Sequence, residues 1–298
     1  LAAVSPQEAA VRQAVAQVRD AVAASAGLRA VPSNLDPPLA RAAGDKAAVF
    51  VNGCVRSWRD TLGNGNQSDC ATGDLASPTT VALVGDSHAA MWSPPFKQVA
   101  EQRHWRLETL GKITCPLQDL PIVSPYLGRE YTECVQWRGQ VMGRLQAEHP
   151  RLIVLSMSRR YGADFSFTAY DPAWMESLTR TVAQLHSTGA KVLVLGPIPD
   201  PHSTVPTCLS GHLDDASACS PPRSVGVNAA GIAAEQAATK AGGGQYADLT
   251  ELFCTAERCP VIIGNDLVYR DDNHVTIEYA QTLSPVIGAL AARALAHG

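Results

Sequence analysis

The sequence predicts an α/β fold: a three-layer α/β/α sandwich of flavodoxin-like type, built on a five-stranded parallel sheet. Apolar runs of strand length lie at 81–85, 105–110, 151–155, 190–195 and 245–249. Stretches with helical character lie between or after them, at 94–104, 132–148, 172–188, 224–241 and 276–296. Because strands that alternate with helices form βαβ crossovers, the sheet is expected to be parallel and covered on both faces.

The 298 residues are expected to divide into an N-terminal extension, 1–49, and one main domain, 50–298. A helix is predicted over 5–25, with Ser5 as N-cap, Pro6 at the first helical position and Glu8 completing a capping box. Residues 26–46 read as a Pro- and Ala-rich wrapping linker, and 50–78 as a loop. Four valines recur at helical spacing: Val11, Val15, Val18 and Val22. This stripe is expected to pack on the main domain, with membrane or partner contact as the alternative.

Eight cysteines stand out in a chain that is large enough to bury a full hydrophobic core without them. Their number is even, and the absence of a Cys-x-x-Cys sequence argues against a structural zinc site. We expect disulfides between neighbours in the sequence, formed in an oxidising compartment, since each pair brackets a loop-like stretch. The pairs are Cys54–Cys70, Cys115–Cys134, Cys208–Cys219 and Cys254–Cys259. The alternative is a cytosolic protein with buried free thiols.

Composition excludes several classes of protein. The net charge of −4 argues against a nucleic-acid partner, because such proteins normally carry a basic stripe. No apolar run approaches the ~18 residues of a membrane span, and no signal segment follows Leu1. If the cysteines reflect export, we expect this sequence to be a mature or excised piece of something larger.

The sharpest local feature is Gly85-Asp86-Ser87-His88, directly after the first core strand. Ligands of open α/β sheets bind at the carboxyl ends of the strands, where this turn is expected. A serine at the start of the next helix would have its N–H in that crevice, which favours a developing oxyanion. The segment is not the Gly-x-Ser-x-Gly elbow of α/β-hydrolases, and no Gly-x-Gly-x-x-Gly phosphate loop is present. Ser87 is therefore predicted to be a nucleophile.

A serine nucleophile needs a base, and His274 is favoured among the eight histidines. Asp271 lies three residues before it, ahead of the final helix. In a tight turn this spacing lets the carboxylate accept the imidazole Nδ1–H, which leaves the other nitrogen free to take a proton from serine. His88 is adjacent to Ser87 in the sequence, and neighbours on a helix do not face each other.

Together the two motifs resemble the SGNH (GDSL-like) hydrolase family. The closer resemblance is to SGNH domains fused to bacterial membrane acyltransferase family 3 proteins. Its similar segments are Gly85–Ala89 with Trp92, Cys115-Pro116 with Cys134 and Trp137, and Cys254 to Cys259-Pro260 before Tyr269–His274. It covers about 50–298, and the preceding residues resemble the extension that these domains carry. The resemblance implies Ser87 as nucleophile, His274 as base and Asp271 as the residue that orients it. We expect no metal and no cofactor.

Two segments depart from the family pattern. The family has a glycine after the second strand, and here either Gly111 or Thr114 could take its place in the oxyanion hole. The asparagine that the family has after the third strand is replaced by Ser-Met-Ser-Arg-Arg at 156–160. The missing donor is expected from Ser158, Arg159 or a backbone N–H.

Other residues near these motifs have two readings. Arg159 and Arg160 would meet an anionic or polar substrate, or form a solvated pair. Trp92 would stack on a sugar or pack in the core. Asp86 and Asp272 are expected to be structural, with Asp86 holding the nucleophile turn and Asp272 capping the last helix, which Thr276 could also cap.

The resemblance implies transfer or hydrolysis of an acyl group, usually acetyl, on a cell-envelope glycan or glycolipid outside the cytoplasm. We favour O-acyl transfer through a Ser-His-Asp acyl-enzyme, in a protein tethered to the membrane. A membrane acyltransferase domain would supply the acyl donor, and a polysaccharide or glycolipid would accept the group. A carbohydrate acetylesterase and a non-catalytic glycan-binding or docking module are the alternatives. A flavodoxin-like cofactor binder is disfavoured because the phosphate loop is missing.

Overall fold

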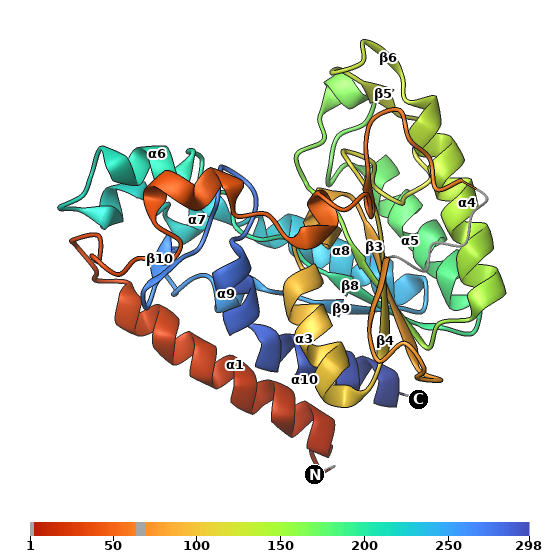
Figure 1. Ribbon diagram of the computed structural model, residues 1–298, viewed down its shortest axis with the longest axis horizontal. Coiled ribbons are helices and arrows are strands. Elements are labelled where there is room, and N and C mark those ends of the chain that lie inside the picture. The colour runs from red at the N-terminus through yellow and green to blue at the C-terminus, as the bar shows by residue number, and fades with distance from the viewer. Residues whose placement is uncertain (1–2, 64–69, 298) are drawn as a thin grey trace.

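The computed structural model describes residues 3–63 and 70–297. A mixed sheet occupies its centre, and five parallel strands form most of it in the order β4-β3-β7-β8-β9 (Figure 1). These are the five predicted strands: β3 (Thr80–Gly85), β4 (Arg106–Lys112), β7 (Leu152–Ser156), β8 (Lys191–Leu195) and β9 (Gln245–Ala247). The three-layer α/β prediction is confirmed.

The expected number of five strands is wrong, because two short strands extend the sheet to seven within the described part of the chain. The parallel β1 (Val55–Arg56) and the antiparallel β2 (Ala71–Gly73) both pair with β4 at the same edge. Both lie in the segment 50–78 that was expected to be a loop. They are only two and three residues long and half-buried, so they lack the alternation that marks a strand in a sequence.

The apolar strands divide the interior into two cores, one on each face of the sheet. Val81 and Leu83 belong to one core, and Ala82 and Val84 belong to the other. Successive side chains of a strand point to opposite faces, so a strand that is covered on both sides is apolar throughout.

Helices cover both faces of the sheet (Figure 1). On the first face lie α1 (Pro6–Ser25), α3 (Ser93–Arg103), α9 (Ile277–Thr282) and α10 (Ser284–Ala296). On the second lie α4 (Thr132–Glu148) and α5 (Pro172–His186), with α8 (Ala229–Ala241) packed on α5. The helix predicted over 276–296 is divided into α9 and α10, and that over 224–241 into α7 (Arg223–Gly226) and α8. Asn228 begins α8 by accepting the Gly231 N–H at 2.9 Å.

The remaining elements are short and lie in the connections. The helices are α2 (Ser87–Ala90) and α6 (Val205–Ser210), and the strand pairs are β5 (Val123–Ser124) with β6 (Arg129–Glu130) and β10 (Ile262–Ile263) with β11 (Asp266–Leu267). The 3₁₀ turns are η1 (Leu39–Gly44), η2 (Ala48–Phe50), η4 (Ala163–Phe165), η5 (Ala216–Cys219) and η6 (Thr250–Leu252).

The N-terminal extension packs on the main domain, as expected from the valine stripe. Ser5 Oγ accepts the Glu8 N–H at 3.1 Å at the start of α1. Val11 and Val22 are buried in the first core, and α1 lies against α10. Residues 26–49 then run past the β10–β11 hairpin to α9, where Asp45 Oδ2 accepts the Ile277 N–H at 2.7 Å.

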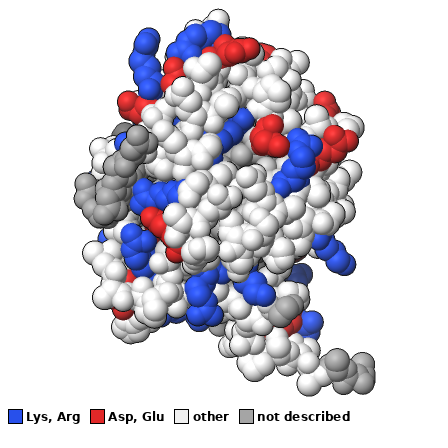
Figure 2. Space-filling view, turned by 90° about the vertical axis from the view of Figure 1, so that its right-hand side faces the viewer, with Lys and Arg blue, Asp and Glu red and all other residues white. Residues whose placement is uncertain are grey.

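Four disulfides join the predicted neighbours, which confirms the expected pairing: Cys54–Cys70, Cys115–Cys134, Cys208–Cys219 and Cys254–Cys259. Among the described residues, none of the helices combines the length and apolarity needed to cross a bilayer. On the face drawn in Figure 2, basic and acidic side chains are mixed and separated by wide uncharged areas.

Candidate active site

The turn that carries Ser87 is formed by a close approach of β3 and β7. Gly85 pairs with Ser156 in the sheet, at a φ of +151°. A Cβ atom on Gly85 would lie 1.9 Å from the Ser156 carbonyl oxygen, so only glycine fits here. The chain then enters α2, where Ser87 is the first residue and Asp86 is the N-cap.

Asp86 holds this turn against the end of β7. Its buried carboxylate accepts the N–H of His88 at 2.8 Å, the N–H of Ser158 at 2.8 and 3.1 Å, and the Tyr161 hydroxyl at 2.6 Å. Burial raises the pKa of Asp86 above its ordinary value, although these hydrogen bonds oppose the rise. The expectation that Asp86 is bonded to the nucleophile turn is confirmed.

The final turn brings His274 and Asp271 to Ser87. His274 Nε2 lies 2.8 Å from Ser87 Oγ, and His274 Nδ1 lies 2.8 Å from Asp271 Oδ2. The Arg270 N–H donates to the His274 carbonyl at 3.0 Å and closes the turn. In this arrangement the imidazole can take the serine proton while the carboxylate binds its other N–H.

Asp271 is ionised by its surroundings. Burial alone would raise the pKa of this carboxyl. The hydrogen bond from His274, the backbone N–H of Asn273 and the Arg270 guanidinium lower it by more, so the pKa lies below its ordinary value. The backbone N–H groups of His274 and Asn273 donate to Asp271 Oδ1 at 2.7 and 2.9 Å. Both carboxylate oxygens are thus hydrogen-bonded, and the contact to Oδ2 holds the His274 ring in a fixed orientation.

A second histidine, His88, contacts this turn through Asn273 and the His274 ring. The His88 ring lies 5.0 Å from the His274 ring, and its Nε2 is 3.3 Å from Asn273 Oδ1. Burial, with the nearby His274 second, holds the pKa of His88 well below its usual range. His88 is therefore neutral, and its Nε2–H donates to the Asn273 side chain.

Ser87 and His274 line a cavity of about 560 Å³, here called the serine pocket. Aromatic side chains form much of its wall although no sequence motif singles them out: Phe50, Trp58, Tyr126, Tyr161 and Phe165. The ring centres of Trp58 and Tyr126 lie 5.1 Å apart with the rings tilted by 37°, and Tyr126 is 71% exposed. Of the residues that stand out in the sequence, Cys54 is the nearest along the chain to Trp58, four positions before it.

The four expected oxyanion residues are placed differently. Thr114 and Ser158 line the serine pocket, and Thr114 has a left-handed backbone with φ of +48°. The Gly111 N–H donates to the Cys54 carbonyl at 3.4 Å in the sheet edge, so it is not free. The Ser158 N–H donates to Asp86, so only the Ser158 hydroxyl remains as a donor to an oxyanion.

Arg159 does not line the serine pocket, contrary to its expected role there. Its guanidinium forms a buried ion pair with Glu235 at 2.8 Å and donates to the carbonyls of Met157 and Leu195. Despite the burial, Glu235 raises the pKa of Arg159 above its ordinary value. This arginine is a structural tie between β7, β8 and α8.

Two further expectations are corrected. Asp272 does not cap the last helix, because it pairs with Arg160 at 3.1 Å; Thr276 caps α9 instead, accepting the Tyr279 N–H at 3.1 Å. Trp92 is 1% exposed and packs against Phe253, so it belongs to the core and not to a sugar platform.

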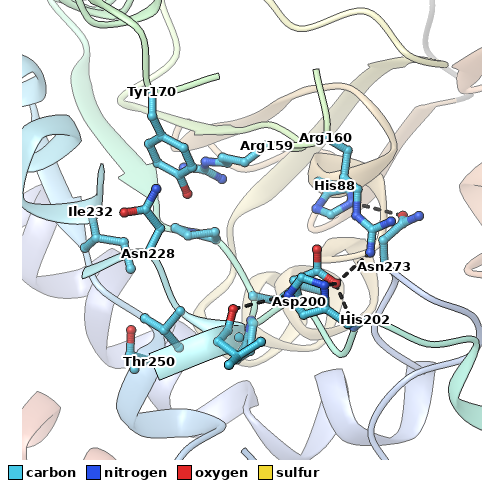
Figure 3. A pocket seen from close by; sticks show the side chains of 16 residues that line it. His88, Arg159, Arg160, Tyr170, Asp200, His202, Asn228, Ile232, Thr250 and Asn273 are labelled. Carbon is cyan, nitrogen blue, oxygen red and sulfur yellow. Dashed lines mark hydrogen bonds and ion pairs between the residues drawn. The ribbon is translucent and has the colours of Figure 1, made fainter. Parts of the chain in front are cut away.

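A second pocket of about 220 Å³ adjoins the serine pocket (Figure 3). Arg160 and Asn273 line both cavities, and Arg160 also pairs with Asp200 at 2.9 Å. Figure 3 shows His88 and Asn273 on one side of this pocket and Tyr170 beside Arg159 on the other. The Arg160 ion pairs thus lie at the boundary between the two cavities.

Among the described residues, one group of side chains lies close enough together to hold a metal ion: Cys208, His212 and Cys219. The two cysteines form a disulfide, so neither offers the thiolate that a metal would need. This group does not fit a metal ion.

Comparison with known proteins identifies the family and the fold of the chain. The periplasmic domain of a lipopolysaccharide acetyltransferase from Salmonella ser. Paratyphi A has a similar fold, with a TM-score of 0.58 and 16% sequence identity over 71% of this chain and 83% of that one. No curated protein matches the chain significantly in sequence. The model of the SGNH domain that is fused to AT3 domains matches residues 53–289, which include Ser87, Asp271 and His274. Because this match spans most of the sequence, the chain belongs to the family of SGNH domains fused to AT3 domains.

Proposed function

We propose that the chain is an extracytoplasmic O-acyltransferase domain that transfers an acyl group, most simply acetyl, to a cell-envelope glycan or glycolipid. The observation that carries this proposal is the continuous series of contacts from Ser87 Oγ through His274 to Asp271, at 2.8 Å each. Residues 50–298 carry the chemistry in this proposal, and 1–49 support it from outside. The four disulfides favour an oxidising compartment.

The reaction has two halves. Ser87 Oγ attacks the acyl carbonyl carbon as His274 Nε2 takes its proton, and the same proton then passes to the leaving group as its bond to the carbonyl carbon breaks. A sugar hydroxyl attacks the resulting acyl-enzyme, gives its proton to His274, and leaves as the ester while Ser87 recovers a proton. Asp271 stabilises the imidazolium in both halves.

The negative oxygen of each tetrahedral intermediate needs hydrogen-bond donors. We assign the Ser87 N–H and the Thr114 N–H or hydroxyl to this role, with the Ser158 hydroxyl as a third donor. Removal of one such donor typically lowers kcat by ~100- to 1,000-fold, so Thr114→Ala and Ser158→Ala rank their contributions.

A membrane AT3 domain is proposed to bring the acyl group to Ser87. The family is described as SGNH domains fused to AT3 domains, and the transfer of the acyl group between the two domains is the step that we propose. If water replaces the sugar hydroxyl in the second half, the same acyl-enzyme gives an acetylesterase.

The test is acetyl transfer from 4-nitrophenyl acetate by the purified chain, with and without candidate glycans, alongside labelling by a fluorophosphonate serine probe. We expect both activities to disappear in Ser87→Ala. Product that forms only as free acetate would make the domain an esterase. Unchanged turnover and labelling in Ser87→Ala would leave a non-catalytic binding module.

A further inference from the structure

The serine pocket carries an excess of positive charge. Four basic residues line it, and among the described residues none that lines it is acidic: Lys46, Arg56, Arg160 and Arg270. Arg160 is neutralised by Asp200 and Asp272, and Arg270 lies 3.2 Å from Asp271. Lys46 and Arg56 form no ion pair within the described part of the chain.

Arg56 is the better placed of these two free cations. Its Nε is buried and has no hydrogen-bond partner among the described residues. A buried donor without a partner is unfavourable, and in native proteins such groups are rare. Arg56 also lies next to the proposed oxyanion segment, since its carbonyl accepts the Ile113 N–H at 3.0 Å and Ile113 precedes Thr114.

The loop after Arg56 presents an aromatic platform to the same pocket. Lys112 holds this loop from inside the protein: its ammonium donates to the carbonyls of Ser57 and Asp60 and lies over the Tyr131 ring. Trp58 is thereby placed against Tyr126, whose ring is largely exposed. Exposed aromatic rings offer an apolar face on which a sugar ring can stack.

We propose that the serine pocket selects an acceptor sugar that carries an anionic group, a carboxylate or a phosphate. Arg56 and Lys46 bind the anion, and Trp58 with Tyr126 stacks on the sugar ring. This inference rests on the proposed acyl transfer to a glycan and names the class of acceptor. Arginine suits the task because its fixed fork of donors matches both anions.

The test uses a pair of aryl acetates, 3-acetoxybenzoate and its methyl ester, whose leaving groups take the place of the acceptor. The measured quantity is the ratio of kcat/KM for the anionic ester to that for the neutral ester. Comparing this ratio between variants cancels the intrinsic reactivity of the esters. We expect it to fall about tenfold or more in Arg56→Gln and further in the double variant with Lys46→Gln, with partial rescue in Arg56→Lys. Because the site is open to solvent, salt should lower the wild-type ratio.

Arg59→Gln is the matched control, because Arg59 is exposed and is not one of the residues that line the pocket. Its ratio should equal that of the wild type. An unchanged ratio in the double variant, with unchanged thermal melting, would overturn the proposal.

A competition arm then identifies the anion: methyl glycosides are compared with their uronates and their 6-phosphates as inhibitors of ester turnover. If the wild type cleaves neither ester, the proposed acyl transfer fails, and this result leaves the charge preference of the pocket to a binding experiment. In that case calorimetry of 3-acetoxybenzoate against its methyl ester, with Ser87→Ala, still decides the charge preference. Equal affinities there would also overturn it.

Discussion

Replacing Asp271 by Asn is expected to lower kcat/KM for ester cleavage by about 1,000-fold or more without unfolding the domain. The asparagine oxygen can still accept the N–H groups of Asn273 and His274, so the turn survives. Its amide group cannot accept the His274 Nδ1–H, which favours the wrong tautomer of the base. In the wild type the imidazolium is stabilised by a carboxylate at 2.8 Å. Opposite unit charges at ~4 Å attract by ~4 kcal/mol at an effective dielectric constant near 20, which is roughly three powers of ten in rate.

The assay is the initial rate of 4-nitrophenyl acetate cleavage, with circular dichroism melting as the measure of folding. Asp272→Asn is the control, because it makes the same substitution one residue away and breaks only the half-exposed pair with Arg160. Such pairs contribute ~0–1 kcal/mol, so a loss of no more than a few-fold is expected. The reasoning is refuted if Asp271→Asn keeps more than a tenth of the wild-type kcat/KM, or if Asp272→Asn loses as much.

Three further predictions concern the surroundings of the proposed triad. His88→Ala removes the hydrogen bond between His88 and the Asn273 side chain, so it should lower kcat by roughly 10- to 100-fold with little change in KM. The same loss of kcat with a large rise in KM would contradict a positioning role for His88. Replacing Cys115 and Cys134 by Ala should reduce the free energy of unfolding by ~3 kcal/mol, measured by urea denaturation, since the closed loop spans 19 residues. Burial and the neighbouring Asp45 raise the pKa of Glu278 to about 7. The folded state therefore binds more protons than the unfolded state between about pH 4.5 and 7, and the free energy of unfolding should fall as pH rises through this window; Glu278→Gln should flatten that dependence in thermal melts.

The arrangement of Ser87, His274 and Asp271 could be predicted from the sequence because each of its parts is local. Asp271 and His274 lie within one turn, and Ser87 lies two residues after an apolar strand, at the edge of the sheet where the final turn also lies. The disulfides were predictable for the same reason, since the bonded cysteines are close in the sequence.

What the sequence did not reveal depends on distant partners. Arg159 follows β7 as a substrate-binding residue would, but its charge is taken by Glu235, 76 residues later. The strands β1 and β2 exist because the edge of β4 offers them hydrogen bonds, and their own residues carry no strand pattern. The aromatic wall of the serine pocket is assembled from Trp58 and Tyr126, which the Lys112 contacts and the fold bring together.

The residues that precede position 53 matter for any chimera built from this domain. Phe50 lies edge-on to the His274 ring at 6.4 Å, and the Arg270 guanidinium lies 5.3 Å from the Phe50 ring centre. Phe50 and Asp45, whose side chain contacts α9, both lie before residue 53, where the family match begins. A chimera that exchanges 53–289 alone would carry Ser87, Asp271 and His274 but would lack the Phe50 ring that contacts the His274 ring. The transplantable unit therefore starts at the Asp45 contact or earlier.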